Sequence, residues 1–330
     1  MVALGLLVGL FWCEATGRRF WQVPWRSRET PEVHDAAAAA RLRAKAHVIL
    51  FTLDGPITDD VRDPLLMPRL HAAIARQGLW LDAHVASASS LSLPGYQALA
   101  VGRLTDCTDN DCERVQDETT ADFLARALQW SPDQAAVFGS WSRLALAVSS
   151  EDGGVTVDTP PEGDSKPDRP WRNARLDVET FARAFDFWRE HHPRFLQLSL
   201  LDADEWAHRG DRERYRAALM RSDVMLGAFL DEVALLPPDE RALTTVLVTS
   251  DHGRGAFDWR EHQPWDYGGG PIFFVALGEG VARDAKRELV DQRDVRWTIE
   301  RLFGVCTAAR RPPGAGHPIE ALVHGLPCDD

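Results

Sequence analysis

Short apolar runs alternate with segments of helical periodicity along most of the chain, and this alternation restricts the fold more than any other feature of the sequence. Residues 47–53 (HVILFTL) and 271–278 (PIFFVALG) are apolar almost throughout, as strands buried on both faces are. Parallel strands need crossover connections, which are usually helices. We therefore predict an α/β fold, a three-layer α/β/α sandwich with a mostly parallel central sheet.

The individual elements can be placed on the sequence by the periodicity of their apolar residues and by the Gly and Pro residues that separate them. The predicted strands are 47–53, 79–87, 135–141, 195–201, 242–250 and 271–278. The predicted helices are 62–78, 94–102, 120–130, 176–192, 211–236 and 294–304. Residues 150–175 are rich in Gly, Pro and Asp and are predicted to form a long loop.

The 330-residue chain is predicted to carry one catalytic domain, residues 46–330, after a linker at 18–45 that contains some helix. The formal net charge of −13 argues against a nucleic-acid-binding surface. Residues 2–13 carry no charge, and small residues at 15 and 17 suit cleavage, so residues 1–17 are interpreted as a signal peptide or a short membrane anchor. We therefore expect an exported protein, periplasmic or extracellular, with possible membrane association through its N-terminus.

The cysteines favour the same compartment. Without Cys13 four remain: Cys107, Cys112, Cys306 and Cys328. Two local disulfides, Cys107–Cys112 and Cys306–Cys328, fit an oxidising environment. Spacing alone does not determine connectivity, so four unrelated thiols are the alternative.

Polar residues of one chemical kind follow several predicted strands. Asp54 follows the first strand, Asp204 and His208 follow the strand 195–201, Asp251 and His252 follow the strand 242–250, and His262 precedes the last strand. Carboxylates and imidazoles without thiolates suit zinc or manganese. Ser92 lies two residues before Pro94, a residue that often begins a helix, so its hydroxyl is expected beside the free N–H groups of a first turn.

The ordered set of these motifs resembles the alkaline phosphatase superfamily, which includes nucleotide pyrophosphatase/phosphodiesterases, sulfatases and phosphonate hydrolases. The resemblance covers residues 46–325 and implies that Ser92 is the nucleophile. It implies one divalent ion, most often zinc, on Asp204, His208 and His262. It implies a second ion on Asp54, Asp251, His252 and the oxygen of Ser92. In the late helix, Arg296 and Trp297 replace the small residue and proline that are common in the superfamily.

The expected activity is hydrolysis of a small-molecule phosphate ester, mono- or diester, through a covalent phosphoserine. A serine hydroxyl is a poor nucleophile until a cation lowers its pKa, so Ser92 must contact an ion. The first turn of the helix after Ser92 and Arg254 are candidate donors to the transition state. Ser87, Ser89 and Ser90 are interpreted as loop or supporting hydroxyls, and Trp206, Trp259 and Trp265 as candidates to line the pocket mouth.

The same residues also fit other roles. Singly, Asp54 and the serines suit helix caps, and an Asp-His pair after a strand is common. A sulfatase-like site needs the pattern C/S-x-P-x-R and usually an Asp-Asn pair, but Tyr96 and His252 occupy those positions. A phosphonate hydrolase or a phospho-group transferase would use the same site, although such transferases usually carry several transmembrane helices.

Overall fold

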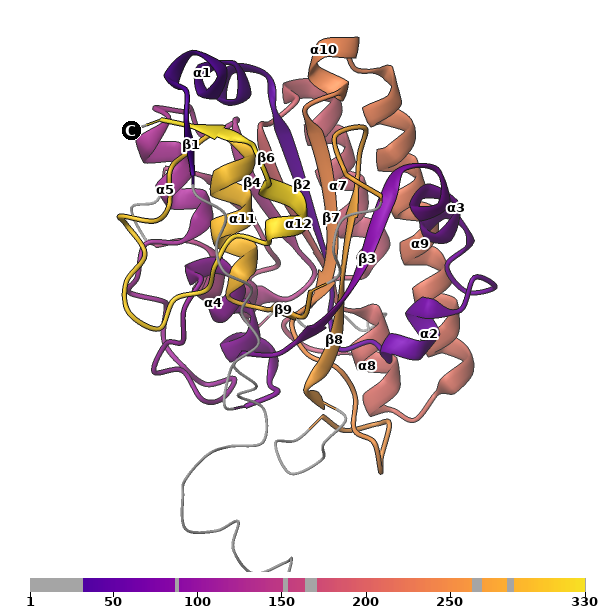
Figure 1. Ribbon diagram of the computed structural model, residues 1–330. Coiled ribbons are helices and arrows are strands. Elements are labelled where there is room, and N and C mark those ends of the chain that lie inside the picture. The colour runs from indigo at the N-terminus through magenta and orange to yellow at the C-terminus, as the bar shows by residue number, and fades with distance from the viewer. Residues whose placement is uncertain are drawn as a thin grey trace, which may run out of the picture.

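The described part of the chain, in a computed structural model, comprises residues 32–86, 89–150, 154–163, 171–262, 269–283 and 288–329. Its central sheet lies between two layers of helices (Figure 1). The predicted three-layer α/β/α sandwich is therefore confirmed.

The sheet is mostly parallel, as predicted. Among the described residues it has eight strands in the order β5-β4-β6-β2-β7-β8-β3-β9. Only β8 runs against its neighbours, β7 and β3, within this part of the chain. The strands are β2 (His47–Leu53), β3 (Gly78–His84), β4 (Ala135–Gly139), β5 (Thr156–Asp158), β6 (Phe195–Leu200), β7 (Thr244–Ser250), β8 (Pro271–Leu277) and β9 (Val290–Asp291).

Both faces of the sheet are buried, which explains the continuous apolar runs. Successive side chains of a strand point to opposite faces. In β2, Val48 and Leu50 pack in one core cluster, whereas Ile49, Phe51 and Leu53 pack in the other. The first cluster is covered by α4 (Ser92–Val101), α5 (Thr120–Ala127), α6 (Ala145–Val148) and α11 (Asp294–Leu302). The second is covered by α2 (Thr58–Arg62), α3 (Pro68–Gln77), α7 (Asp177–His191), α8 (Asp202–His208) and α9 (Arg212–Leu235).

Two elements differ from the pattern-based expectation. The helix expected at 62–78 is divided into α2 and α3, because Pro68 occupies the first position of α3 and cannot continue a preceding helix. The loop expected at 150–175 contains β5, which pairs with β4 at the edge of the sheet. Three residues are too few for a periodic signal.

The described part of the segment before residue 46, residues 32–45, is folded. Here β1 (Val33–His34) pairs with β10 (Pro327–Cys328), and α1 (Ala36–Lys45) buries Ala39 and Leu42. The remaining short elements are the 3-10 turn η1 (Ser142–Leu144), α10 (Pro238–Arg241) and α12 (Glu320–Val323).

The predicted cysteine pairs are both present. Cys107 is bonded to Cys112 and Cys306 to Cys328, with Cα–Cα distances of 5.6 and 5.0 Å. In the described ranges no helix has the length and apolar character needed to cross a membrane. The segment predicted as signal peptide or anchor, residues 1–17, lies outside the described residues.

Candidate metal centre and nucleophile

The register of the sheet explains why residues far apart in sequence meet. Leu53 of β2 pairs with Ser250 of β7 and with Leu200 of β6, so all three strands end at one level. Asp54 and Asp251 therefore follow neighbouring strands, and α8 begins just after the third. This edge, outside the carboxyl ends of the strands, is where open α/β sheets bind ligands.

Six of the seven predicted ligands, all except Ser92, form two groups, each with ligand atoms within 4.8 Å of one another. One group is Asp54, Asp251 and His252, and the other is Asp204, His208 and His262. The two groups adjoin, because the rings of His252 and His262 stack with centroids 3.8 Å apart. The structure thus brings together the residues that the sequence analysis assigned to each ion.

Ser92 lies beside the first group. It is the first residue of α4 and is buried. Its Oγ donates to Asp54 Oδ1 at 3.4 Å and lies 3.1 Å from His252 Nε2. Of the other serines, Ser90 donates to the backbone oxygen of His262, and Ser87 lies outside the described residues.

The second group depends on α8 and on a loop after β7. Asp204 and His208 are four apart on α8, so they share one face, and His208 Nε2 lies 3.3 Å from Asp204 Oδ2. His262 Nε2 lies 3.1 Å from His208 Nε2, and His262 Nδ1 lies 2.5 Å from the oxygen of Ser90. That backbone contact fixes Nδ1 as the donor and leaves Nε2 for an ion.

Glycine is required where the chain leaves β2. Gly55 has φ +48°, and a Cβ there would approach His252 Cε1 at 2.5 Å and Asp204 Oδ1 at 2.6 Å. Its N–H donates to Asp251 Oδ1 at 3.1 Å. The backbone at residue 55 thus lies against ligands of both groups.

Arg254 is engaged by protein groups rather than directed at a substrate. Its guanidinium donates to the oxygen of Gly55 at 2.7 Å, to the oxygen of Asp204 at 2.9 Å and to the Asp204 carboxylate. Arg254 therefore orients Asp204, and the suggestion that it donates directly to the transition state is not supported by these contacts.

Two of the three tryptophans expected at the pocket mouth pack against other aromatic rings. Trp206 contacts Trp171, with ring centroids 5.3 Å apart, and Trp259 packs on Tyr215 at 5.7 Å. Trp206 lies midway between Asp204 and His208 in sequence, which places it on the other side of α8. Trp265 lies outside the described residues.

The buried carboxylates of the first group are electrostatically unfavourable without a cation. Burial, and then the charge of Asp204, raises the pKa of Asp54 well above its usual value. Burial, and then the charge of Asp54, likewise raises the pKa of Asp251. Asp251 Oδ2 is buried without a hydrogen-bond partner among the described groups. A divalent ion would satisfy this oxygen and both charges, so the residues present fit a metal site.

The second group has a different charge balance. Burial raises the pKa of Asp204, but Arg254 and His208 outweigh it, so this pKa is held well below its usual range. Burial, and then His252, lowers the pKa of His262. Burial lowers the pKa of His208, but the Asp204 carboxylate prevails and raises it. Asp204 and His262 are thus held in the deprotonated forms that metal ligands need.

Asn110 was missed by the sequence analysis. Its Oδ1 accepts from the backbone N–H of Leu93 at 2.9 Å, immediately after the nucleophile position. The loop that carries it is closed by the Cys107–Cys112 disulfide and held by Arg143, which donates to the oxygen of Asn110 at 2.5 Å. Its position inside the pattern CTDNDC was a usable signal, because a disulfide constrains so short a loop. The expected first-turn donor at Leu93 is therefore already engaged.

Gln292 was also missed. Its Nε2 donates to the backbone oxygen of Asp251 at 2.6 Å, and its side chain is buried. An isolated glutamine in the segment before α11 carries no motif, so no sequence signal pointed to it. It fixes the backbone from which Asp251 and His252 project.

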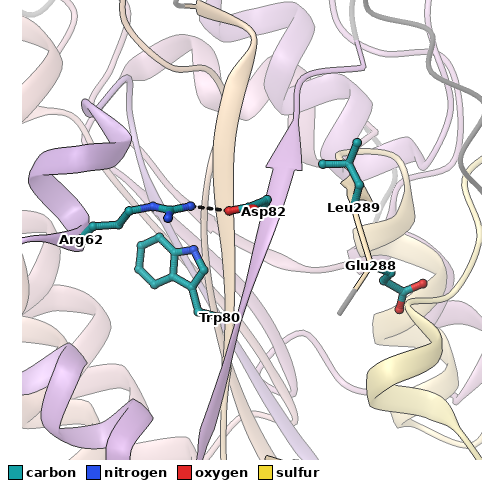
Figure 2. A pocket seen from close by; sticks show the side chains of 5 residues that line it. All are labelled: Arg62, Trp80, Asp82, Glu288 and Leu289. Atoms are coloured by element: carbon teal, nitrogen blue, oxygen red, sulfur yellow. Dashed lines mark hydrogen bonds and ion pairs between the residues drawn. The ribbon is translucent and has the colours of Figure 1, made fainter. Parts of the chain in front are cut away.

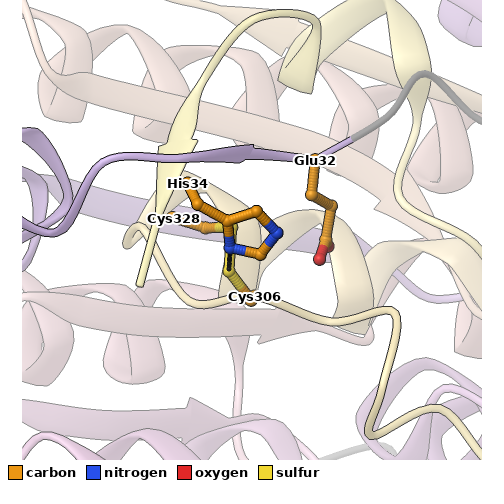
Figure 3. A group of neighbouring side chains, drawn as sticks. All are labelled: Glu32, His34, Cys306 and Cys328. Atoms are coloured by element: carbon orange, nitrogen blue, oxygen red, sulfur yellow. Dashed lines mark hydrogen bonds between the residues drawn. A yellow bond between two sulfur atoms is a disulfide. The ribbon is translucent and has the colours of Figure 1, made fainter. Parts of the chain in front are cut away.

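Two further features lie apart from these groups. Glu32, His34, Cys306 and Cys328 come together near the pairing of β1 with β10 (Figure 3), but the two sulfurs are joined in a disulfide and are not free ligands. A surface pocket of about 290 Å³ is lined by Arg62, Trp80, Asp82, Glu288 and Leu289 (Figure 2). Arg62 pairs with Asp82 in it and lies over the ring of Trp80, and none of its lining residues belongs to the predicted site.

Comparisons with known proteins agree with this architecture. No protein-family model matches the sequence, and no curated protein does. Among solved structures, a putative sulfatase from Bacteroides thetaiotaomicron superposes with a TM-score of 0.61 and 16% identity, over 84% of this chain and 75% of that one. The lipoteichoic acid synthase LtaP from Listeria monocytogenes gives 0.57 and 12%, over 85% and 76%.

A third solved structure is described directly as a member of the superfamily that the motifs resemble. This Vibrio parahaemolyticus protein of the alkaline phosphatase superfamily gives a TM-score of 0.54 and 14% identity, over 81% of this chain and 74% of that one. At such identities the likeness concerns the fold. Together with the ordered strand-end residues, it shows that this chain has the fold of the alkaline phosphatase superfamily.

Proposed function

We propose that the protein is a metal-dependent hydrolase of phosphate esters, with Ser92 as its nucleophile and two divalent ions as cofactors, for which the ligand chemistry favours zinc. The observation that carries the proposal is the position of Ser92. Its hydroxyl lies within 3.4 Å of Asp54 Oδ1 and 3.1 Å of His252 Nε2, two atoms of one ligand group, while the second group adjoins through His262.

The ions, when bound, lower the pKa of the serine hydroxyl and neutralise charge on the phosphoryl oxygens. Asp54, Asp251 and His252 would hold one ion, and Asp204, His208 and His262 the other. Ser92 Oγ then forms a bond to phosphorus while the ester P–O bond breaks and the alcohol leaves. Water cleaves the phosphoserine, which releases phosphate and restores the hydroxyl.

Asn110 has a role in this scheme. Because its Oδ1 accepts from Leu93, its amide NH₂ group is left to donate to an oxygen of the substrate. Arg254 and Gln292 contact other protein groups instead of the substrate. Arg254 holds Asp204, and Gln292 holds the backbone of Asp251. None of these three residues needs to change its protonation state during turnover.

A sulfate ester is the second candidate substrate, and the comparisons favour it over a phosphate ester because the similar solved structures include sulfatases. Against it, Tyr96 stands four residues after Ser92, where the sulfatase pattern has arginine. A third outcome is transfer of the phosphoryl group to an alcohol instead of water, for which the likeness to a lipoteichoic acid synthase is the support.

One assay separates these candidates. Purified protein, stripped by chelator and reloaded with zinc or manganese, is given an aryl phosphate, a phosphodiester, a phosphonate ester and an aryl sulfate. We expect about two ions per chain and ion-dependent release from a phosphate ester. Faster release from the sulfate would establish the sulfatase, and product formed only with added alcohol would establish the transferase. Full activity in metal-free protein would refute the proposal.

We further propose that the protein is exported. Two disulfides in the described part of the chain, together with the apolar residues 2–13, support this location. Cell fractionation followed by thiol alkylation without reductant is the test. Protein found in the cytosol with Cys107, Cys112, Cys306 and Cys328 all alkylated would contradict the proposal.

A further inference from the structure

Tyr96 and Ser92 contact the same carboxylate from one helix. Tyr96 Oη donates to Asp54 Oδ2 at 3.1 Å, and Ser92 Oγ donates to the other oxygen, Oδ1, at 3.4 Å. Residues four apart lie on the same face of a helix. One turn of α4 therefore supplies a separate partner to each oxygen of Asp54.

The two oxygens of Asp54 consequently differ in their surroundings. Oδ1 also lies 3.4 Å from His252 Nε2, so it faces the ligand group and the nucleophile. Oδ2 is engaged by the phenol. A carboxylate held in this way presents one oxygen to an ion, whereas a carboxylate free to rotate presents either oxygen or both.

The phenol is held firmly in place. Tyr96 is 2% exposed and packs in the first core cluster with Leu93 and Leu99 of the same helix. The C-terminal end of α4 is fixed from α11, where Arg296 donates to the oxygen of Val101 at 3.0 Å and Trp297 to that of Gly102 at 2.9 Å. These are the two residues that depart from the superfamily's late-helix pattern.

We propose that Tyr96 is a positioning residue: its hydroxyl donates to Oδ2 of Asp54 and thereby leaves Oδ1 to coordinate the ion beside Ser92. The inference rests on the proposed metal-dependent function but holds whichever ester is cleaved. It predicts that the phenol governs the affinity of one ion and, through that ion, the reactivity of Ser92.

The test is Tyr96→Phe, which keeps the ring and removes only the hydroxyl. Chelator-stripped protein is titrated with zinc in a calorimeter, without substrate. We expect one of the two zinc affinities to fall about 10- to 100-fold and the other to stay at the wild-type value. With limiting zinc kcat should fall at unchanged KM, and excess zinc should restore most of it.

Tyr215→Phe is the matched control. Tyr215 is an equally buried tyrosine whose Oη accepts from the N–H of Ile57 at 2.8 Å, outside both ligand groups. We expect its zinc affinities to equal those of wild type. Equal weakening in both variants would indicate a general packing defect and would overturn the proposal, as would wild-type affinities in Tyr96→Phe.

A double-mutant cycle keeps the proposal testable if a single variant is poorly folded. If Tyr96 acts through Asp54, adding Tyr96→Phe to Asp54→Asn should cause little further loss of zinc affinity. Additive losses would show that the hydroxyl acts elsewhere. Failure of the proposed function would be distinct, because wild-type protein would then bind no zinc, or would bind it and cleave none of the esters.

Discussion

At the scale of single residues, the site is defined by polar atoms that need a cation. Asp54 and Asp251 are buried side by side with raised pKa values, and Oδ2 of Asp251 has no hydrogen-bond partner among the described groups. The Ser92 hydroxyl contacts Asp54, and Ser92 is buried as well. In the metal-free protein such an arrangement lowers the free energy of unfolding. Binding of a divalent ion offsets that loss, which is why such groups are found at functional sites.

Ser92→Ala should lower turnover of a phosphate ester by at least about a thousandfold, which corresponds to about 4 kcal/mol of transition-state stabilisation. Zinc content, measured by elemental analysis, should stay at the wild-type value because the six carboxylate and imidazole ligands remain. Ser90→Ala is the control. Its hydroxyl donates to the backbone oxygen of His262 and not to a ligand side chain, so we expect less than about a tenfold loss. Undiminished turnover in Ser92→Ala would mean that another group attacks phosphorus.

At the scale of elements, α4 is the part of the fold that links nucleophile, ligand and core. Gly95 lies so close to the loop after β7 that a Cβ would approach the backbone oxygen of Asp251 at 2.4 Å. The helix can neither rotate nor slide without moving that oxygen. Gln292, which lies just before α11, donates to the same backbone oxygen. The backbone of Asp251 and His252 is therefore held by two contacts, one with α4 and one with Gln292.

Gly95→Ala should therefore displace α4 from the metal centre. We expect a marked loss of both thermal stability and zinc affinity, because the clash is with backbone, which cannot turn aside. Gly227→Ala, in α9, is the matched control: its Cβ would meet the flexible end of the Arg69 side chain. There the gain in helix propensity, up to about 1 kcal/mol, should leave stability equal or higher. Unfolding monitored by circular dichroism, with and without zinc, measures both. Equal changes of thermal stability and zinc affinity in Gly95→Ala and Gly227→Ala would show that α4 is not tightly fixed.

At the scale of the whole molecule, the site exists because strands β2, β6 and β7 end in register. Folding of the sheet thus concentrates carboxylates at one edge before any ion binds, and this couples metal binding to stability.

Removing the ions should make stability depend on pH in a defined direction. A carboxyl whose folded pKa lies above its unfolded value of 3.8 contributes stability below pH 3.8, and that contribution is lost as the pH rises through the raised value. For Asp54 and Asp251 we therefore expect the gap in Tm between zinc-loaded and chelator-treated protein to widen as the pH rises from about 4 towards 8.

Asp251→Asn supplies the internal check on this pH effect. It removes one of the two buried charges and keeps an oxygen to accept from Gly55. In chelator-treated protein at neutral pH this variant should melt at a higher temperature than wild type, while it binds zinc more weakly. A gap in Tm that does not change with pH, or a less stable metal-free Asp251→Asn, would contradict the assigned electrostatics.

Much of this protein can be predicted from local sequence. The apolar runs determined that the sheet is buried on both faces, because a strand covered on one side only would alternate, and β2 and β8 do not. Carboxylates and imidazoles near the strand ends marked the candidate ligands, since carboxyl ends of parallel strands meet at one edge, and the resemblance to the superfamily assigned them to two ions. Two local disulfides were expected from an even number of cysteines in an oxidising environment, with four unrelated thiols as the alternative, and both pairs are bonded.

Only the tertiary structure determines the contacts between segments that lie far apart in the sequence. The reversed direction of β8, the packing of Trp206 away from the metal centre and the capture of Arg254 by Asp204 all depend on neighbours distant in sequence. The same holds for Asn110 beside Leu93 and for Tyr96 on Asp54, 42 residues away. Periodicity reports which face of an element is apolar, whereas the partner of a buried polar atom is chosen by the register and packing of the complete fold.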